Sequence, residues 1–278
     1  MLQEIYPKKF NNVYDADAEI TDEDYVLIFA GRDVVFKNEN YDVLKYRDIK
    51  HKIGDSKTQY LFSIDKDRFF WVDNVDADEY TVRKKIIDMR YHEPQWYGYA
   101  AACGEALKNW YKSSKFCGVC GGKTVHSTTE RAMVCSECGH TIYPRICPAV
   151  IAAVTDGDKI LLIKYAYGPY KKYALVAGYN EIGETPEETV KREVMEETGL
   201  EVDNLKYFGS QPWPFSGSML LGYFCELAGE NKIRIDKKEL SEARWMDRAE
   251  LEEDKIAESL TKTMIETFRK YGNDWDVH

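Results

Sequence analysis

The sequence contains no long hydrophobic run. Its longest apolar stretches, such as residues 149–154, are far shorter than the roughly 20 apolar residues that a membrane-spanning helix needs. The opening segment, MLQEIYPKKFNN, has no apolar core of the kind found in secretory signals. With 44% hydrophobic and 31% charged residues, the composition is that of a soluble globular protein. We therefore expect a cytoplasmic protein without a membrane partner.

An excess of positive charge is also absent. The chain has 48 acidic and 38 basic residues, which gives a formal net charge of −10. A general duplex-binding protein would carry a basic face, so that class is not expected, although a local basic groove is compatible with the composition. The acidic balance also suits an enzyme that recruits metal cations in order to bind an anionic substrate.

Cysteine is scarce, and its pattern is not that of a disulfide framework. The chain has seven cysteines, an odd number, and no secretion signal is expected. Cys103, Cys147 and Cys225 are isolated, and we expect them to pack on apolar faces. The other four form two Cys-x-x-Cys pairs separated by fourteen residues. They are Cys117, Cys120, Cys135 and Cys138.

The two cysteine pairs have the spacing of a structural zinc site. Thiolate pairs on tight turns suit tetrahedral Zn²⁺, and four sulfur ligands leave no open position for catalysis. Redox-active or merely buried thiols are the alternative interpretation. We expect one structural zinc ion per chain, held in a zinc ribbon over residues 113–146.

Ahead of the ribbon, the pattern predicts an N-terminal α+β domain over residues 1–112. Apolar runs around short polar turns predict hairpins, and an apolar period of three to four residues predicts helices. The expected hairpins are 25–30 with 33–37 and 58–64 with 68–72, and the expected helices are 81–90 and 97–112. No motif in residues 1–90 indicates a chemical function.

After the ribbon, strands and helices alternate in an order that predicts an α+β or α/β sandwich over residues 147–278. The expected strands are 149–154, 159–165, 173–177, 207–209, 219–227 and 243–246. The expected helices are 186–198 and 256–271.

The first of these helices is strongly acidic and lies within GYNEIGETPEETVKREVMEETGL, residues 178–200. Thr185 is a suitable N-cap, and Pro186 fits the first helical position. Glu188 completes a capping box, and Gly199 is a natural stop. These signals predict both ends of the helix.

Three carboxylates, those of Glu193, Glu196 and Glu197, should share one face of this helix. Like charges this close repel each other by a few tenths of a kcal/mol per pair. Hard divalent cations prefer oxygen ligands, would relieve this repulsion, and can bring a phosphate and an activated water together. The charge pattern therefore indicates metal-assisted attack on a phosphate.

A solvated acidic helix is the alternative interpretation. Two ion pairs between residues four apart, Glu187–Lys191 and Glu188–Arg192, would stabilise such a helix. The face with the three glutamates has no cation four residues further on, so these pairs do not account for its charge.

The acidic stretch resembles the Nudix box, G-x5-E-x7-R-E-U-x-E-E-x-G-U, in which U is a bulky aliphatic residue. The matching residues are Gly178, Glu184, Arg192, Glu193, Val194, Glu196, Glu197, Gly199 and Leu200. The resemblance implies a Nudix α/β/α sandwich that hydrolyses a nucleoside diphosphate linked to another group. It implies that Glu193, Glu196 and Glu197 supply the divalent-metal ligands and the base. Arg192 would orient a carboxylate.

A second motif, SQPWPF, follows the box at residues 210–215. Two prolines around a tryptophan predict a rigid aromatic loop that could stack on a base, and a packing turn between strands is the alternative. Together with the cysteine pairs, the motif is similar to that of the NADH pyrophosphatase (NAD⁺ diphosphatase) subfamily of Nudix hydrolases. This resemblance covers residues 97–278 and implies a homodimer with the substrate pocket near its interface.

The subfamily resemblance implies roles for individual residues. The four paired cysteines would bind zinc. The catalytic cation, Mg²⁺ or Mn²⁺, would be bound by the Ala177 carbonyl, Glu193, Glu197 and Glu239. The implied substrate-binding residues are Tyr179, Gln211, Pro212, Trp213, Pro214, Phe215, Ser216, Gly217, Ser218, Tyr143, Glu130 and Ala257. The chain departs from the subfamily pattern at Tyr179, Asn180 and Ser216, which bears on substrate preference rather than on metal chemistry.

The expected reaction is hydrolysis of the pyrophosphate of NAD(H) to AMP and nicotinamide mononucleotide. A metal-activated water would attack phosphorus, with Glu196 or Glu197 taking the proton. The alternatives within this chemistry are ADP-ribose or a dinucleoside polyphosphate as substrate, and removal of an NAD cap from RNA. A different class, a zinc-ribbon binding module with an inactive Nudix fold, is disfavoured by the complete set of box carboxylates.

Overall fold

The computed structural model describes residues 1–53, 56–73, 82–168, 170–253 and 258–277, and the chain divides into two compact units. The N-terminal unit comprises residues 2–145 together with 214–217. The C-terminal unit comprises residues 146–213 and 218–278 with Met1. The division of the chain into three domains at residues 112 and 146 stays a prediction.

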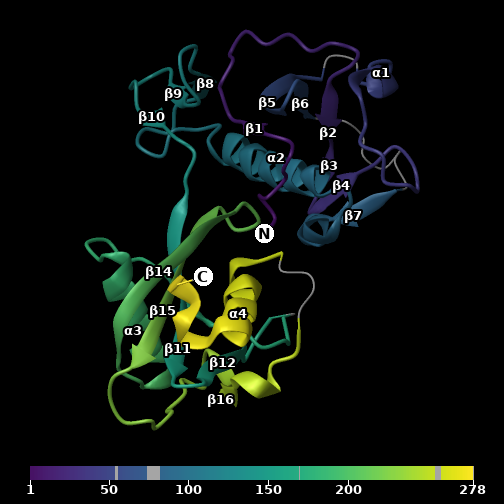
Figure 1. Ribbon diagram of the computed structural model, residues 1–278. Coiled ribbons are helices and arrows are strands. Elements are labelled where there is room, and N and C mark those ends of the chain that lie inside the picture. Colours follow the sequence, from purple (N-terminus) through teal and green to yellow (C-terminus); the bar gives the residue numbers. More distant parts are fainter. Residues whose placement is uncertain (54–55, 74–81, 169, 254–257, 278) are drawn as a thin grey trace. The chain divides into compact units, whose positions relative to one another are not determined.

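Within the described residues, the N-terminal unit combines small sheets with helices (Figure 1). One sheet has the order β1-β5-β6-β2, from β1 (Phe10–Asn11), β2 (Tyr25–Leu27), β5 (Thr58–Ile64) and β6 (Asp67–Val72). Another has the order β3-β4-β7, from β3 (Phe29–Ala30), β4 (Asp33–Val35) and β7 (Arg83–Lys85). A further one has the order β10-β9-β8, from β8 (Thr124–His126), β9 (Met133–Cys135) and β10 (Thr141–Ile142). The helices are α1 (Tyr46–Ile49), the 3-10 helix η2 (Ile86–Tyr91) and α2 (Gln95–Ser113).

Helix α2 contributes its buried face to the core of this unit. Ala100 and Trp110 pack in one cluster with Leu61 of β5. Gly104 permits a close approach, because a Cβ at this position would lie 2.3 Å from the Cδ1 atom of Leu27. The small residues of α2 therefore bring its backbone near the strands, as the predicted amphipathic helix at 97–112 requires.

The predicted hairpin of residues 58–72 is confirmed by β5 and β6, which pair antiparallel. The predicted strand 25–30 was wrong in part, since it is interrupted. β2 pairs in parallel with β6, and β3 turns at Gly31, whose φ is +61°, into β4.

The predicted helix 81–90 was wrong in its first half, and its second half is a 3-10 helix. Residues 83–85 form β7, which pairs with β4, and the 3-10 helix η2 follows. The physical reason is that the backbone N–H and C=O groups along the edge of β4 need hydrogen-bond partners, which residues 83–85 supply as a strand. Ile86 and Met89 are buried and three residues apart, a spacing that suits one side of a 3-10 helix. Residue 81 lies outside the described residues.

The C-terminal unit is built on one mixed sheet with the order β14-β15-β11-β12-β16, and β13 also pairs with β11 (Figure 1). Its strands are β11 (Cys147–Asp156), β12 (Lys159–Tyr165), β13 (Val176–Tyr179), β14 (Val202–Trp213), β15 (Ser218–Leu227) and β16 (Leu240–Asp247). Its helices are α3 (Pro186–Thr198) and α4 (Leu260–Tyr271), with the 3-10 helices η3 (Arg248–Glu250) and η4 (Gly272–Val277).

The alternation of β11 explains why helices cover both faces of this sheet. Val150, Ala152 and Val154 belong to a core cluster with Val190 and Val194 of α3. The intervening residues of β11, such as Ile151, belong to a second cluster that includes Leu260, Met264 and Phe268 of α4. Both faces of β11 are apolar, so a layer is required on each side. The expected α/β/α sandwich is confirmed.

Several predicted boundaries in the C-terminal unit differ from the structure. β13 occupies 176–179 rather than 173–177, because it pairs with the first half of β11. β14 runs from 202 to 213, so part of the SQPWPF motif is strand rather than loop. Helix α4 begins at Leu260 after its N-cap Ser259, later than predicted, and residues 256–257 lie outside the described residues. Cys147, expected on an apolar face, is exposed at the start of β11.

Among the residues that the structure describes, no helix is both long enough and apolar enough to cross a membrane.

Candidate functional site

The acidic helix α3 begins and ends at the predicted residues. Thr185 Oγ1 accepts the Glu188 N–H at 3.2 Å, and the Glu188 carboxylate accepts the Thr185 N–H at 2.7 Å. Gly199 ends the helix with φ of +69°. Val190 and Val194 are fully buried in the core cluster of the sheet. Because these valines fix the rotation of the helix, they also fix the direction of its glutamates.

Arg192 lies at the centre of an ion-pair network. Its Nε and Nη2 donate to the Glu184 carboxylate at 2.6 and 3.0 Å, and its Nη1 donates to Glu193 at 2.7 Å and Glu196 at 2.9 Å. Nη2 also donates to the Tyr179 carbonyl at 3.0 Å. The hydrogen bond from the guanidinium is the main cause that lowers the pKa of Glu184 to about 2. Arg192 therefore orients three box carboxylates, those of Glu184, Glu193 and Glu196, and ties α3 to β13.

The two ion pairs expected of a solvated helix are replaced by tertiary contacts. Lys191 Nζ lies 3.2 Å from the Asp203 carboxylate, and Glu187 accepts a hydrogen bond from Tyr223 Oη at 2.9 Å. Arg192 serves the network described above. Lys191 thus binds a partner outside the helix, whereas Arg192 combines the i,i+4 pair with Glu196 with contacts to Glu184 and Tyr179 outside the helix.

Glu193 lies in tight contact with the strand that precedes the helix. A Cβ at Gly178 would lie 1.9 Å from Glu193 Cδ and 2.1 Å from its Oε1, so only glycine leaves room for this carboxylate. Burial raises the pKa of Glu193 despite the opposing hydrogen bond from Arg192. The backbone of β13, which includes the Ala177 carbonyl, therefore runs close beside a partly desolvated carboxylate.

Glu197 is the most buried of the three glutamates. It is 3% exposed, and its Oε2 has no hydrogen-bond partner among the described residues. Burial, together with the charges of Glu193, Glu239 and Glu196, raises its pKa to about 8. An unpartnered buried carboxylate oxygen is costly, and a bound cation would remove that cost.

Glu239 approaches the cluster from the segment before β16. Its carbonyl accepts the Ala166 N–H at 2.8 Å, and its own N–H donates to the Asp236 carbonyl at 3.1 Å. The Asp236 N–H in turn donates to the Glu197 carbonyl at 3.0 Å. This chain of backbone bonds joins the end of β12, the Glu239 segment and the end of α3.

Tyr165 is a member of this site that no feature of the sequence indicates. It is the last residue of β12, and burial raises its pKa to about 12, with the Glu197 charge as the next cause. Neither a motif nor a period marks it as a site residue. Pairing of β12 with β11 and β16 brings it near the carboxylates.

These residues fit a hard divalent cation. The donors are carboxylate and carbonyl oxygens, one carboxylate oxygen is buried without a partner, and the Gly178 backbone leaves space only for the Glu193 carboxylate. Oxygen donors of this kind are the preferred ligands of Mg²⁺ and Mn²⁺. The donor types present therefore suit a hard divalent cation.

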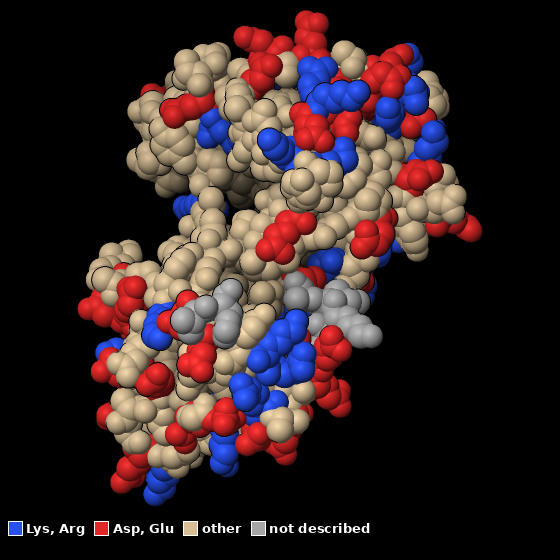
Figure 2. Space-filling model, in the orientation of Figure 1, with Lys and Arg blue, Asp and Glu red and all other residues tan. Residues whose placement is uncertain are grey.

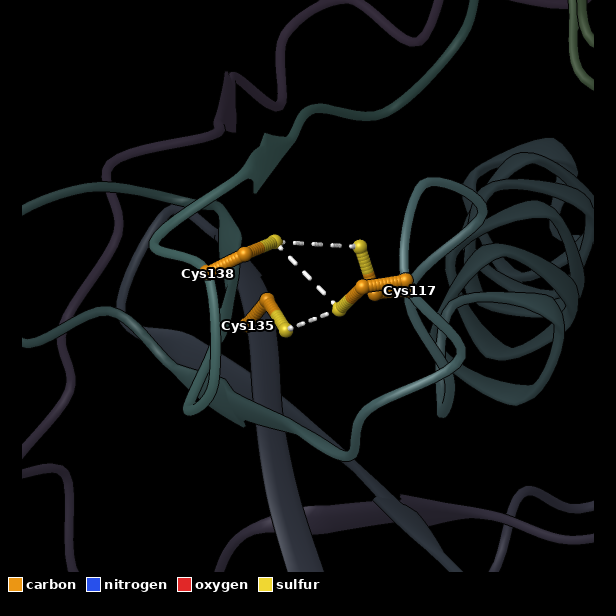
Figure 3. Close-up of side chains that lie close together, drawn as sticks. Cys117, Cys135 and Cys138 are labelled. Atoms are coloured by element: carbon orange, nitrogen blue, oxygen red, sulfur yellow. Dashed lines mark hydrogen bonds between the residues drawn. The ribbon is translucent and has the colours of Figure 1, made fainter.

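The four paired cysteines come together in the N-terminal unit (Figure 3). Their Sγ atoms all lie within 4.8 Å of one another. The closest distances are 3.4 Å between Cys120 and Cys138, 3.5 Å between Cys120 and Cys135, and 3.7 Å between Cys117 and Cys138. Hydrogen bonds from the backbone of Cys138 and Glu137 lower the pKa of Cys135 to about 7. Four clustered sulfurs of which one ionises readily fit a closed zinc site.

Comparisons with known proteins match the two regions of the chain in which these clusters lie. A NUDIX domain model matches residues 145–268, and a model for the NADH pyrophosphatase zinc ribbon domain matches residues 112–143. A Vibrio atlanticus protein named NAD-capped RNA hydrolase NudC is 30% identical over 265 residues, which cover 92% of this chain and 95% of that protein. The chain belongs to the Nudix hydrolases that carry an NADH pyrophosphatase zinc ribbon.

Further relatives match over a shorter stretch. Proteins with the same name from Citrobacter koseri and Escherichia coli are 45% and 44% identical over 145 residues. These alignments cover 52% of this chain and 56% of each relative, about half of their length. A solved Nudix hydrolase from Nitrosomonas europaea covers 56% of this chain and 90% of its own, with 23% identity and a TM-score of 0.49.

In the present chain, the side chains of two predicted substrate-binding residues, Tyr179 and Ser218, lie side by side. Tyr179 Oη and Ser218 Oγ are 3.2 Å apart, and the Tyr179 carbonyl accepts the hydrogen bond from Arg192. The Tyr179 side chain is 52% exposed, so part of its ring is open to a ligand.

Gln211 has a position that the motif alone does not reveal. It is 0% exposed, its Nε2 donates to the Glu258 carbonyl at 3.2 Å, and its Oε1 accepts the Leu260 N–H at 2.7 Å. The side chain thus joins β14 to the segment that enters α4. Pro212 and Trp213 follow it in β14, where they pair with the first residues of β15.

The remaining predicted residues belong mostly to the N-terminal unit. The loop Pro214, Phe215, Ser216 and Gly217 lines a cavity of about 570 Å³ there, together with Trp110 and Arg145 among others. Tyr143 donates a hydrogen bond to the Glu130 carboxylate at 2.9 Å. Ala257 lies outside the described residues.

Proposed function

We propose that the protein hydrolyses the pyrophosphate of NAD(H) to AMP and nicotinamide mononucleotide, and that an NAD cap on RNA is a second form of the same substrate. The observation that carries this proposal is the buried Glu197, whose unpartnered oxygen lies among further box carboxylates. The SQPWPF motif and the relatives named NAD-capped RNA hydrolase NudC support the choice of substrate.

The proposed reaction is attack of water on a phosphorus atom. The water oxygen forms a bond to phosphorus, the bond from phosphorus to the bridging oxygen breaks, and Glu196 or Glu197 accepts the proton. The residues proposed to hold the cation are Ala177, through its carbonyl, Glu193, Glu197 and Glu239. When bound, Mg²⁺ or Mn²⁺ neutralises phosphate charge and lowers the pKa of a bound water.

The protein's own residues prepare the carboxylates for this step. Arg192 holds Glu193 and Glu196 in fixed directions through hydrogen bonds of 2.7 and 2.9 Å. Glu197 is buried, and electrostatic interactions of its carboxylate are stronger there than in water. We propose that the exposed part of the Tyr179 ring stacks on a ring of the substrate.

The direct test is incubation of the full chain with NADH and either Mg²⁺ or Mn²⁺. Release of AMP and nicotinamide mononucleotide is expected, and no turnover with either ion would overturn the proposal. Glu197→Gln should lower turnover by roughly 100-fold or more, since a cation ligand and candidate base is lost. Glu201→Gln, which changes an exposed glutamate just past the helix, should retain activity.

Substrate choice is tested by comparing kcat/KM for NADH, NAD⁺, ADP-ribose, a dinucleoside polyphosphate and NAD-capped RNA. We expect the highest kcat/KM values for the substrates that contain NAD. If kcat/KM is higher for ADP-ribose or for the dinucleoside polyphosphate, that compound rather than NAD(H) is the preferred substrate. The proposed hydrolysis of a pyrophosphate bond would still stand.

We also propose that the enzyme is a cytoplasmic homodimer with one structural zinc ion per chain. The subfamily resemblance and the clustered cysteines support this assignment. Light scattering of the zinc-loaded full chain should give twice the mass of the 32.3 kDa monomer. A monomer mass at the concentrations used for the NADH assay would contradict it.

A further inference from the structure

A second cavity, of about 640 Å³, is lined entirely by residues of the N-terminal unit. It lies where the β5–β6 hairpin, the end of α2 and the start of the zinc ribbon meet. None of the roles argued above involves its residues. Its lining combines lysines with aromatic rings, which distinguishes it from an apolar packing void.

Backbone hydrogen bonds bring the lysines of this cavity together. The Asp73 N–H donates to the Lys57 carbonyl at 3.2 Å, which closes the open end of the β5–β6 hairpin. The Thr124 N–H donates to the Lys115 carbonyl at 3.2 Å, and an antiparallel bridge pairs Phe116 with Lys123. Lys57, Lys115 and Lys123 therefore line the same hollow, although Lys57 precedes β5, Lys115 follows α2 and Lys123 precedes β8.

The charge balance of the cavity is positive in an acidic protein. Both signs of charge are spread over the face shown in Figure 2, and the chain as a whole carries −10. The acid that lines the cavity, Asp73, pairs with Lys115 at 3.7 Å and with Lys112 at 3.1 Å. Among the described residues, Lys57 and Lys123 form no ion pair. Two cations that have no ion-pair partner within the described residues, at one hollow, favour an anionic ligand.

The rings of the cavity offer a flat apolar surface beside these cations. Trp71 and Tyr111 are buried and stacked, with centroids 6.3 Å apart and planes 14° apart, and they form a rigid floor. His126 packs on Tyr111 with a centroid distance of 5.1 Å. Phe116 is 61% exposed. The accessible rings are thus those of His126 and Phe116, and aromatic rings are the usual partners of a nucleobase.

We propose that this cavity binds a nucleotide, with its phosphate neutralised by Lys57 and Lys123 and its base against His126 and Phe116. The nucleotide is either free or part of a single-stranded RNA, because both present the same phosphate and base. The lining of this cavity shares no residue with the hydrolytic carboxylates, so NADH turnover tests the proposed function and nucleotide titration tests this site.

The test is a binding titration of the zinc-loaded full chain without added Mg²⁺ or Mn²⁺. The probes are AMP, ribose 5-phosphate and a short oligoadenylate. Lys57→Glu with Lys123→Glu should weaken binding of AMP or of the oligoadenylate at least about tenfold, since two attractive charges become repulsive. The matched control is Lys66→Glu with Lys85→Glu, two exposed lysines of the same unit outside the cavity, which should bind as the wild type does.

The outcomes separate the possible ligands. Loss of AMP binding in the cavity variant indicates a free nucleotide, and loss of oligoadenylate binding alone indicates RNA. Equal affinity for ribose 5-phosphate and AMP would overturn the role of the rings, and His126→Ala should therefore weaken AMP binding. Unchanged binding in the cavity variant, or no binding by the wild type, overturns the site. Far-ultraviolet circular dichroism and zinc content identify a variant that fails to fold. In that case the same titrations are made with the milder double variant Lys57→Gln with Lys123→Gln, which removes the two charges without reversing them.

Discussion

Arg192 shows how one residue organises the carboxylate cluster. The stretch 178–200 contains one arginine among seven acids, which suggests that Arg192 compensates their charge. The structure shows that Arg192 also fixes the directions of several of these carboxylates. Its planar fork contacts Glu184 through two nitrogens and still reaches Glu193 and Glu196. A lysine ammonium is a point charge without this fork and cannot keep all these contacts at once.

Arg192→Lys should therefore lower kcat/KM for NADH by about 10- to 100-fold, the usual effect of losing a residue that orients metal ligands. The measurement is a steady-state NADH assay at saturating Mg²⁺ or Mn²⁺, with a urea unfolding curve beside it. Lys191→Arg is the control, because Lys191 pairs with the exposed Asp203. Full activity in Arg192→Lys would show that positive charge alone is sufficient.

The burial of His92 leads us to expect that the N-terminal unit loses stability in acid. It is buried among Phe36, Tyr41 and Tyr97, and burial lowers its pKa from 6.5 to about 4, with Lys84 adding to the shift. A group whose pKa is lower in the folded state destabilises the fold once the unfolded state binds the proton. Its stabilising contribution is therefore complete above pH 6.5 and is lost as the pH falls toward 4.

His92→Phe should flatten this dependence. The free energy of unfolding of the wild type, measured with urea, should fall between pH 6.5 and pH 4 more steeply than that of the variant. His51→Phe, at an exposed position, should retain the wild-type slope. Identical slopes for wild type and His92→Phe would mean that other groups govern the acid response.

At the scale of elements, the site depends on the contact between β13 and α3. The helix is fixed by its caps and by two buried valines, and the strand is fixed by pairing with β11. The space between them is just wide enough for the Glu193 carboxylate beside Gly178. A small change in this spacing therefore displaces a proposed metal ligand directly.

Gly178→Ala should lower kcat/KM for NADH by roughly 100-fold, because the new methyl group occupies the position of the Glu193 carboxylate and a displacement of about 1 Å has this effect. Gly209→Ala is the matched control, since a Cβ there meets no atom within 4 Å. Both variants are compared by NADH turnover and by their unfolding midpoints. Wild-type turnover in Gly178→Ala would remove Glu193 from the proposed cation site.

At the scale of the whole molecule, the two units have separate cores and different means of support. The C-terminal unit has apolar clusters on both faces of its sheet. The zinc ribbon has strands of only two or three residues and few buried apolar side chains, such as Met133. A segment with so little apolar burial depends on its metal for structure.

Removal of zinc with a chelator should therefore expose residues 112–143 to proteolysis while the C-terminal unit keeps its unfolding temperature. Limited proteolysis followed by mass spectrometry locates the cuts, and Cys120→Ser with Cys138→Ser should reproduce them in the presence of zinc. Equal protection of the ribbon with and without zinc would contradict a structural role for the metal.

The local signals in the sequence predicted local structure well. The capping box and Gly199 predicted α3 at the correct residues, and alternation around a short turn predicted β5 with β6. Predictions failed where a distant partner decided the conformation, as at β7, where pairing with β4 replaced the expected helix. The identity of Tyr165 as a neighbour of the carboxylates depends in the same way on strand pairing.

The sequence by itself determined the chemistry of the protein: four cysteines at zinc spacing, three glutamates on one helix face, and a Nudix box that the comparisons confirm. These features are short in range, because covalent spacing and helical period fix them. Only the tertiary structure decided that Oε2 of the buried Glu197 has no hydrogen-bond partner among the described residues, that Gly178 makes room for Glu193, and that Gln211 joins β14 to α4. Burial and close approach depend on the packing of segments far apart in the chain, which no local pattern encodes.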